Sequence, residues 1–419
     1  MGLQRCKGTR DLSPEEMRRF RFIEGAFRDC CLKWGYGEIK TPTLEYLHLF
    51  TSTGTLTPSM LGKVYSFLDW DGWSGERVVL RPDGTIPVAR LYIDSMEGKG
   101  LAKLFYVTNL FIFEETGKET RERWQGGVEL IGAGSPLADV ELVLLALEVL
   151  KRVGVEDVVL KLSHMGLIRG LLLKLGLSPE EQAKIFDQIL DGGVGVLAGI
   201  KSGKPELDKA LSLLLDLKGK SSGFLKNFKL LFTQSMPELK PSLDNFISIA
   251  DLLESLGHNY QIDLASGRGF EYYTGVIFQL SKAKRIIGGG GRYDALIPLM
   301  GGKNIPASGF ALYFDHLMNL VKPATLAKPL AQGVLIDAEP KAIKQGFDMV
   351  SRLHEAGYVA EFKLEAKEPA EFEWRLNIRS KAPLFVLTDQ TKQRRFEAQT
   401  ADEVLALLRK GNVNKDSVA

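Results

Sequence analysis

The sequence is poor in cysteine and histidine, has almost no net charge and contains no long apolar run, and each absence excludes a class of protein. Its three cysteines, Cys6, Cys30 and Cys31, form no CxxC pair, so we expect neither a zinc site nor a disulfide framework. With 54 Lys and Arg against 52 Asp and Glu, no global field draws the chain to nucleic acid. No stretch reaches the roughly 18 apolar residues of a membrane span, and the first residues lack the apolar core of a signal peptide. We therefore expect a soluble, cytoplasmic protein with no metal, no cofactor and no membrane partner.

The length and the order of the structural signals predict two domains. A chain of 419 residues is too long for one compact domain. Strand signals with flanking helix signals run through residues 1–322, and Leu-rich segments broken by Gly, Ser and Lys predict a helical insertion over about 165–255. Residues 323–329 read as a linker, and the β-α-β alternation beyond it predicts a small α/β domain over 330–419.

Two local patterns near the start of the chain are specific. Ser13, Pro14 and Glu16 precede an apolar helical spacing, which predicts a capped amphipathic helix over residues 13–34. Residues 104–114 and 124–131 are strand-like and flank a polar loop, so we expect an antiparallel hairpin.

The second strand of this hairpin carries polar residues on one face. Gln125, Gly127 and Glu129 share that face because alternate residues of a strand point the same way. Glu129 can accept from an ammonium or an imidazole N–H, and Gln125 can donate and accept. The glycine between them would leave room for a small polar ligand. The alternative is that such side chains only satisfy one another inside a polar core.

Other segments offer groups that suit the same kind of ligand. Arg268 could grip a carboxylate in a bidentate fork, and Tyr272 and Tyr273 would form an aromatic wall. Asp83 and Thr85 supply a further carboxylate and a hydroxyl.

Taken together, short segments of this chain resemble, in the same order, the signature sequences of class II histidyl-tRNA synthetases. They are residues 7–11, 80–85, 125–132, 268–278 and 288–294, and residues 309–312 continue the series. The resemblance implies an α+β fold with a class II synthetase-like antiparallel sheet flanked by helices, and a C-terminal domain similar to the anticodon-binding module. It also implies a histidine pocket built from Asp83, Thr85, Gln125, Glu129, Arg268, Tyr272 and Tyr273. The glycine run at 288–291 would permit close backbone approach beneath the pocket floor.

The chain departs from the synthetase pattern where ATP would bind. Ile112 stands where the family has an arginine for the α-phosphate, and His316 replaces the arginine for the γ-phosphate. Glu119 stands where another arginine is expected. Adenylyl transfer depends on positive charge placed around the phosphates, and losing one such contact costs about 3 kcal/mol of transition-state stabilisation. We therefore expect no catalytic residues and no adenylation.

Synthetase-like chains that keep the amino-acid pocket and lose these arginines are similar to the regulatory subunits of ATP phosphoribosyltransferase. The resemblance implies a non-catalytic subunit that pairs with the short-form catalytic chain in the first step of histidine biosynthesis and transmits inhibition by free L-histidine. It also implies a homodimer, formed through residues 13–45, within a hetero-octamer, and it makes tRNA an improbable partner.

Two alternatives stay open at this stage. One is an active histidyl-tRNA synthetase, against which Ile112 and His316 argue independently. The other is an RNA-binding or amino-acid-binding paralogue with a different partner, because no motif marks the surface that would contact a catalytic subunit.

Overall fold

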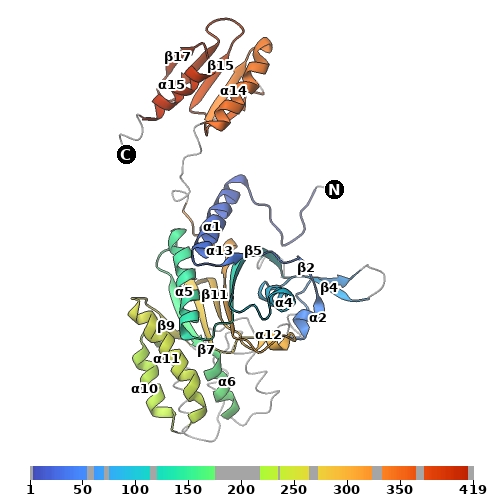
Figure 1. The fold of residues 1–419 in the computed structure, drawn as a ribbon, viewed down its shortest axis with the longest axis vertical. Helices are drawn as coiled ribbons and strands as arrows, with labels where there is room; N and C mark the ends of the chain where they lie inside the picture. Colours follow the sequence, from blue (N-terminus) through green and yellow to red (C-terminus); the bar gives the residue numbers. More distant parts are fainter. Residues whose placement is uncertain are drawn as a thin grey trace. The chain divides into compact units, whose positions relative to one another are not determined.

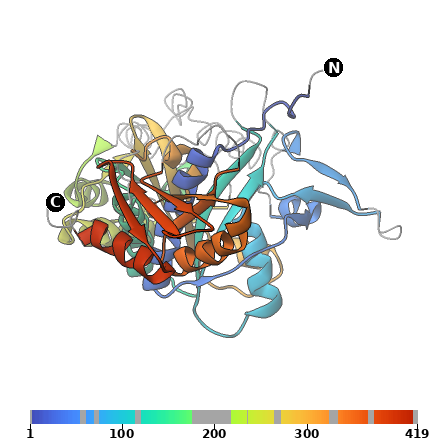
Figure 2. The ribbon, with the colours of Figure 1, turned by 90° about the horizontal axis from the view of Figure 1, so that it is seen from above.

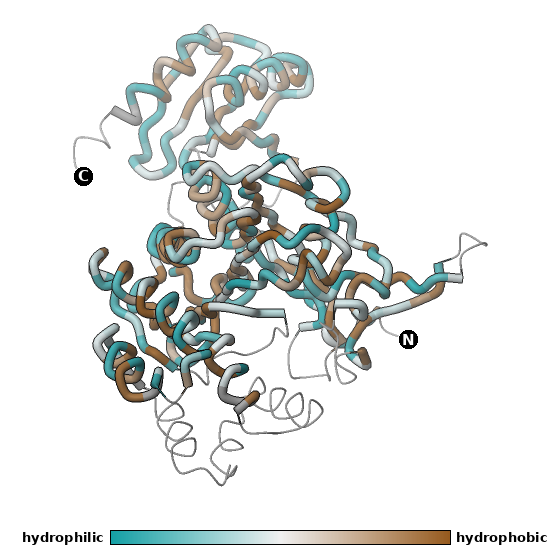
Figure 3. Tube along the Cα trace, turned by 60° about the horizontal axis from the view of Figure 1, so that its bottom comes forward, coloured by the Kyte–Doolittle hydropathy of each residue, from teal (hydrophilic) through white to brown (hydrophobic). Residues whose placement is uncertain are grey.

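The computed structural model describes residues 3–53, 61–69, 75–113, 120–174, 218–234, 236–263, 272–322, 333–364 and 372–413. The chain divides into two compact units, Met1–Lys322 and Pro323–Ala419. Hydrophobic and hydrophilic segments alternate along both units in Figure 3, as expected where each element turns one face to a core.

A nine-stranded mixed sheet forms the centre of the first unit among the described residues. In spatial order its strands are β1 (Gly37–Glu38), β5 (Ala102–Phe111), β6 (Glu122–Ile131), β12 (Ala307–Tyr313), β11 (Arg285–Arg292), β10 (Val276–Lys282), β7 (Val159–His164), β9 (Gln261–Asp263) and β8 (Lys218–Gly219). The expected antiparallel sheet is confirmed for its central strands, while β1 and β9 pair parallel with β5 and β7. The predicted hairpin is present as β5 and β6, with Thr108 opposite Gln125.

Helices cover both faces of this sheet. On one face lie α1 (Pro14–Lys33), α5 (Pro136–Arg152) and α13 (Phe314–Met318), and on the other lies α4 (Thr85–Ser95); Figure 1 shows α5 and α4 on opposite sides of the strands. The predicted capped helix is confirmed, because the Ser13 side chain accepts from the Glu16 backbone N–H and the Glu16 side chain accepts from the N–H of Ser13.

Smaller elements complete the first unit. Three strands form a separate antiparallel sheet: β2 (Leu44–Tyr46), β4 (Arg77–Leu80) and β3 (Ser66–Leu68). Short helices α2 (Leu47–Thr51) and α12 (Leu296–Leu299) lie nearby (Figure 1). Apart from the short strand β8, the described part of the predicted insertion is helical, with α6 (Met165–Lys174), α10 (Ser222–Phe232), the 3-10 turn η1 (Pro237–Leu239) and α11 (Lys240–Ser255). Residues 175–217 of that prediction lie outside the described residues.

The C-terminal unit is a five-stranded sheet with helices beside it, drawn in orange and red in Figure 2. Its strand order is β14 (Val359–Phe362), β13 (Gly333–Ala338), β15 (Trp374–Ile378), β16 (Phe385–Asp389) and β17 (Arg394–Ala398). Its helical elements are η4 (Pro340–Ala342), α14 (Ile343–Glu355) and α15 (Ala401–Val413). Among the described residues of the whole chain, no helix is long and apolar enough to cross a membrane.

Candidate functional site

A single buried carboxylate organises the polar cluster above the central sheet. Glu129 lies in β6 with 1% of its surface exposed. Its Oε1 accepts from the Thr85 hydroxyl at 2.9 Å and from the Tyr106 hydroxyl at 3.4 Å. Its Oε2 accepts from the hydroxyl of Tyr293. Three hydroxyls from a helix, a strand and the residue after β11 therefore converge on one acid.

Burial dominates the electrostatics of this acid. Removal from water raises the pKa of Glu129 to about 8, and the hydrogen bonds from Tyr293 and Thr85 offset only part of that effect. The nearby Asp83 carboxylate acts in the same direction. An acid with such a pKa is largely neutral at pH 7 and becomes charged when a cation is placed beside it. This chemistry suits a ligand that carries an ammonium or an imidazole.

The space expected above Gly127 is filled by the protein itself, which corrects the sequence interpretation. A Cβ on Gly127 would overlap the ring of Tyr106, and a Cβ on Gly84 would overlap its hydroxyl. The Tyr106 hydroxyl accepts from Nε2 of Gln125 at 3.2 Å and donates to Glu129. Gln125 and Glu129 are thus joined through Tyr106, and the glycine admits an aromatic ring instead of leaving a gap for a ligand.

Asp83 is placed by the start of α4. Its Oδ1 accepts from the backbone N–H of Ile86 at 2.9 Å, so the carboxylate caps the first turn of the helix. Burial raises the pKa of Asp83, while backbone N–H groups and the Tyr272 hydroxyl oppose the shift. Asp83 therefore serves both the helix and the tyrosine wall of the cluster.

Three tyrosines form that wall. The ring centroid of Tyr272 lies 5.3 Å from that of Tyr273 and 5.5 Å from that of Tyr293, the latter pair edge to face. All three are buried, and burial raises their pKa values well above 10. The phenols therefore remain neutral hydrogen-bonding groups at physiological pH.

A buried ion pair anchors the turn that presents Tyr293. Arg292 donates to Asp139 through Nη2 at 2.7 Å and through Nε at 3.2 Å, and its Nη1 donates to Asp294 at 3.1 Å. The backbone N–H of Asp294 donates in turn to the Thr274 hydroxyl at 3.0 Å. The residue between these anchors is Tyr293, so its hydroxyl is held toward Glu129.

Six of the seven predicted pocket residues belong to this cluster. They are Asp83, Thr85, Gln125, Glu129, Tyr272 and Tyr273. Arg268 lies outside the described residues. The sequence interpretation missed Tyr106 and Tyr293 as partners of Glu129. Tyr293 stood within the segment 288–294, so the signal for it was present, whereas Tyr106 sits in an apolar strand that gives no such sign.

The two described positions assigned to the missing phosphate contacts, Ile112 and His316, are each held by a backbone carbonyl. The backbone N–H of Ile112 donates to the carbonyl of Arg121 at 2.9 Å, and Nδ1 of His316 lies 2.6 Å from the carbonyl oxygen of Ile286. Asp315, beside His316, forms an ion pair with Arg10 and accepts from the Trp124 backbone N–H at 2.6 Å. Glu119 lies outside the described residues. Within those residues no group of acids, histidines or cysteines could hold a metal.

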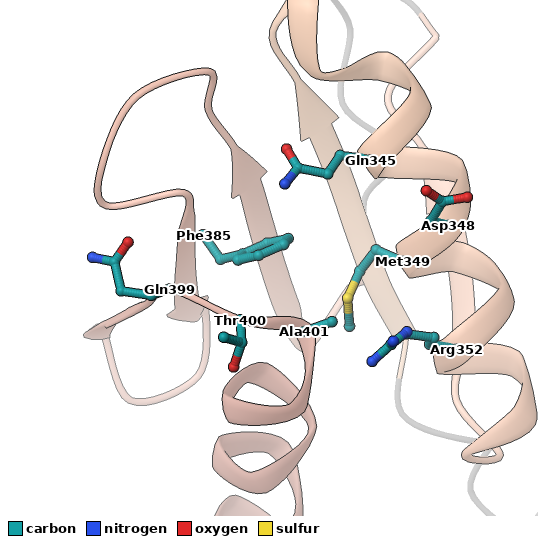
Figure 4. A pocket seen from close by; sticks show the side chains of 8 residues that line it. All are labelled: Gln345, Asp348, Met349, Arg352, Phe385, Gln399, Thr400 and Ala401. Atoms are coloured by element: carbon teal, nitrogen blue, oxygen red, sulfur yellow. The ribbon is translucent and has the colours of Figure 1, made fainter.

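The C-terminal unit has a small pocket of its own, shown in Figure 4. Met349 of α14 and Phe385 of β16 lie at its base, and Gln345, Asp348 and Arg352 line the α14 side. Arg352 is paired with Asp402 at 3.0 Å. The lining combines both charge signs around an apolar base and does not indicate one class of ligand.

Comparison with known proteins decides the family. A family model described as histidyl-tRNA synthetase matches residues 8–317. An ATP phosphoribosyltransferase regulatory subunit of Dehalococcoides mccartyi (strain ATCC BAA-2100) is 49% identical over 406 residues, which is 97% of this chain and 98% of that protein. The chain belongs to the histidyl-tRNA synthetase-like family of ATP phosphoribosyltransferase regulatory subunits.

A more distant relative is a ligase, and two solved structures share the fold. A histidine–tRNA ligase of Methanosarcina acetivorans is 34% identical over 369 residues, or 84% of this chain and 83% of the ligase. The crystal structure of an ATP phosphoribosyltransferase regulatory subunit/histidyl-tRNA synthetase from Bacillus halodurans C has a TM-score of 0.77 at 23% identity and covers 91% of this chain and all of that one. A histidyl-tRNA synthetase from Nostoc sp. PCC 7120 has a TM-score of 0.74 at 18% identity, with 98% and 99% covered. These structures confirm the predicted synthetase-like fold.

Proposed function

We propose that this chain binds free L-histidine at the Glu129 cluster and transmits feedback inhibition. Its family is that of the regulatory, not the catalytic, subunits of ATP phosphoribosyltransferase. The observation that carries the proposal is the buried Glu129, whose pKa is raised to about 8 within a shell of tyrosine and threonine hydroxyls. A cationic ligand relieves the penalty of charging such an acid, so the site favours a molecule with an ammonium or an imidazole.

Histidine matches this chemistry better than most amino acids. It carries both kinds of nitrogen donor, and its flat ring can lie against the aromatic wall of Tyr272 and Tyr293. A second N–H of Gln125 is available in principle for the ligand, because its described bond to Tyr106 uses one of two. Arg268 as the partner of the carboxylate stays a prediction.

The replaced arginines support the regulatory over the ligase alternative. Neither Ile112 nor the imidazole of His316, which is held by a backbone carbonyl, supplies the fixed positive charge that adenylation needs. In addition, Asp315 neutralises Arg10 in the same region. We therefore place histidine biosynthesis ahead of tRNA charging as the role of the chain.

The short-form catalytic subunit remains the proposed partner, with a homodimer inside a hetero-octamer. An exposed apolar row on the small sheet supports a second copy as one neighbour. Tyr46 and Phe67 flank Val78 across three paired strands and are 40% and 42% exposed, and Leu44 on the same face is 48% exposed. Patches of this kind mark interaction sites in soluble proteins.

The test reconstitutes the full chain with the short-form catalytic subunit and titrates L-histidine. Removal of a charged hydrogen bond should weaken ligand binding by roughly 1.5–3 kcal/mol. The complex with Glu129→Ala should therefore need about ten- to a hundredfold more histidine for half inhibition. Inhibition of each complex is measured relative to its own rate without histidine. Glu397→Ala, which removes an exposed carboxylate of the C-terminal unit, is the matched control and should leave the inhibition curve unchanged.

Two results would contradict the proposal. Failure of the chain to co-purify with or activate the catalytic subunit would remove the regulatory role. Unchanged inhibition in both the Glu129→Ala and Arg268→Ala complexes would place the effector site elsewhere. Calorimetry on the isolated chain separates these cases, because it measures histidine binding without the partner.

A further inference from the structure

The strand β12 presents three side-chain positions to the ligand cluster. Register with β6 places Gly309 opposite Glu129, Ala311 opposite Gly127 and Tyr313 opposite Gln125. Alternate residues of a strand share a face, so these three positions lie on the side that carries Gln125 and Glu129.

Only one of these three positions on β12 carries a large side chain. A Cβ on Gly309 would overlap Oε2 of Glu129, which confirms that this face of β12 looks into the cluster. Ala311 adds only a methyl group. Tyr313, which is partly buried, is the only large side chain among the three.

The ring of Tyr313 has a neighbour that is itself held in place. It meets the imidazole of His316 edge to face, with ring centroids 5.7 Å apart and an interplanar angle of 85°. His316 is itself held by the carbonyl of Ile286 at 2.6 Å. Two residues after Tyr313, Asp315 is tied to the Trp124 backbone N–H. Tyr313 therefore lies opposite Gln125 in the sheet and contacts His316, which holds the position assigned to a phosphate contact.

Charge determines which end of an amino acid would face this ring. Glu129 becomes charged when a cation lies beside it, so the cationic groups of a ligand pair with Glu129 and Asp83 and its carboxylate is directed away from them. Gln125 supplies N–H donors at the opposite end of the row, beside Tyr313. A bound amino acid would therefore direct its carboxylate toward Gln125 and Tyr313.

We infer that Tyr313 is a specificity-determining residue that closes this end of the pocket. The site then accepts an amino acid with a free carboxylate and rejects the same amino acid when that carboxylate is joined to a nucleoside. The inference rests on the proposed binding of L-histidine at this cluster. Its physical basis is steric exclusion by the ring of Tyr313, which lies opposite Gln125 and packs edge to face against the imidazole of His316. A sensor closed in this way responds to the free amino acid and not to its activated form.

The experiment measures two ligands by calorimetry on the full chain. The probes are L-histidine and a non-hydrolysable adduct in which the histidine carboxyl is joined through a sulfamoyl group to adenosine. Wild-type protein should bind the adduct at least about a hundredfold more weakly than histidine. Tyr313→Ala should bind the adduct at least about tenfold more tightly than wild type does, with histidine affinity changed by less than about threefold.

Tyr313→Phe is the matched control, because it keeps the ring and removes only the hydroxyl. It should remain closed to the adduct. Thermal melting checks that Tyr313→Ala folds, and Tyr313→Thr, which keeps a residue that favours strands, replaces it if it does not.

The outcomes separate the inference from the proposed function. If histidine binds but wild-type protein takes the adduct equally well, or if the small variants gain nothing, the role of Tyr313 is wrong while the effector site stands. If Tyr313→Phe opens the pocket, exclusion by the ring is wrong. If no form binds free histidine, the effector assignment and the inference fall together.

Discussion

The hydroxyl of Thr85 donates to Oε1 of Glu129 over 2.9 Å, although 44 positions separate the two residues. Thr85 is the first residue of α4 and Glu129 lies near the end of β6. The contact therefore joins helix α4 to the central sheet. It also shows why Glu129 is constrained, since its acceptor oxygens are engaged by protein hydroxyls before any ligand arrives.

Replacement of Glu129 by glutamine should change how stability depends on pH. The pKa of Glu129 is about 8 in the folded chain against 4.5 for the ordinary carboxyl. The folded state holds the proton more tightly, so the stability contributed by protonated Glu129 is complete below about pH 4.5 and is lost as the pH rises through 8. Glu129→Gln, which cannot ionise, should gain stability relative to wild type between pH 5 and about pH 9.

Urea unfolding at pH 5, 7 and 9 would measure this difference in the free energy of unfolding. Glu397→Gln controls for the loss of one exposed carboxylate. A difference between wild type and Glu129→Gln that stays constant over this range would show that burial does not raise the pKa of Glu129.

Arg292→Ala should destabilise the first unit far more than a comparable change at the surface. Arg292 and Asp139 have side chains that are 6% and 3% exposed. Removing one partner leaves the other buried without compensation, which typically costs about 3–5 kcal/mol. Arg352→Ala breaks a pair whose side chains are 49% and 84% exposed, and it should cost less than about 1 kcal/mol. Denaturant midpoints of both variants provide the comparison, and equal shifts would refute the structural role of the buried pair.

Two glycine-to-alanine changes should have opposite signs. An alanine at position 309 would overlap the Glu129 carboxylate, so we expect a destabilisation of about 1–3 kcal/mol and a weaker histidine response. Gly25 lies in α1 with open space where a Cβ would be, and alanine there should stabilise the helix by about 0.5–1 kcal/mol. Thermal melting of both variants tests the prediction, which fails if Gly309→Ala is neutral.

The purified chain should show no histidine-dependent exchange between ATP and pyrophosphate. Fixed positive charge around the phosphates supplies most of the catalysis in such transfers, and Ile112 and His316 provide none in place of the expected arginines. Ile112→Arg alone should not restore exchange, because Tyr313 and His316 remain. A histidine–tRNA ligase assayed in parallel serves as the positive control. Exchange by the wild-type chain above background would overturn the regulatory assignment.

Local features of the fold followed from the sequence because they depend on neighbours in the chain. The capping pattern of Ser13 and Glu16 determined where α1 begins, and apolar spacing determined the face it buries. Strand parity placed Gln125 and Glu129 on one face of β6, and the structure shows them joined through Tyr106. The β-α-β alternation predicted for the small domain accounts for fewer strands than the five in its sheet.

The four glycines at 288–291 are explained by contacts between strands and not by their neighbours in the chain. Residues 288–291 were expected to permit close backbone approach beneath the pocket, and all four lie inside β11, where the backbones of β10 and β12 come close to them. A Cβ on Gly290 would overlap the backbone carbonyl of Gly309. Glycine is unfavourable in a strand by itself, so only the crowding between neighbouring strands explains its presence.

The sequence by itself determined which residue types could serve a histidine-like ligand, because side-chain chemistry and strand parity are properties of the chain alone. Tertiary structure decided that Tyr106 occupies the space above Gly127, that Tyr293 reaches Glu129 across 164 positions and that Tyr313 stands opposite Gln125. These relationships depend on strand order and register, which are set by long-range packing. The raised pKa of Glu129 has the same origin, since removal from water is a consequence of the assembled fold.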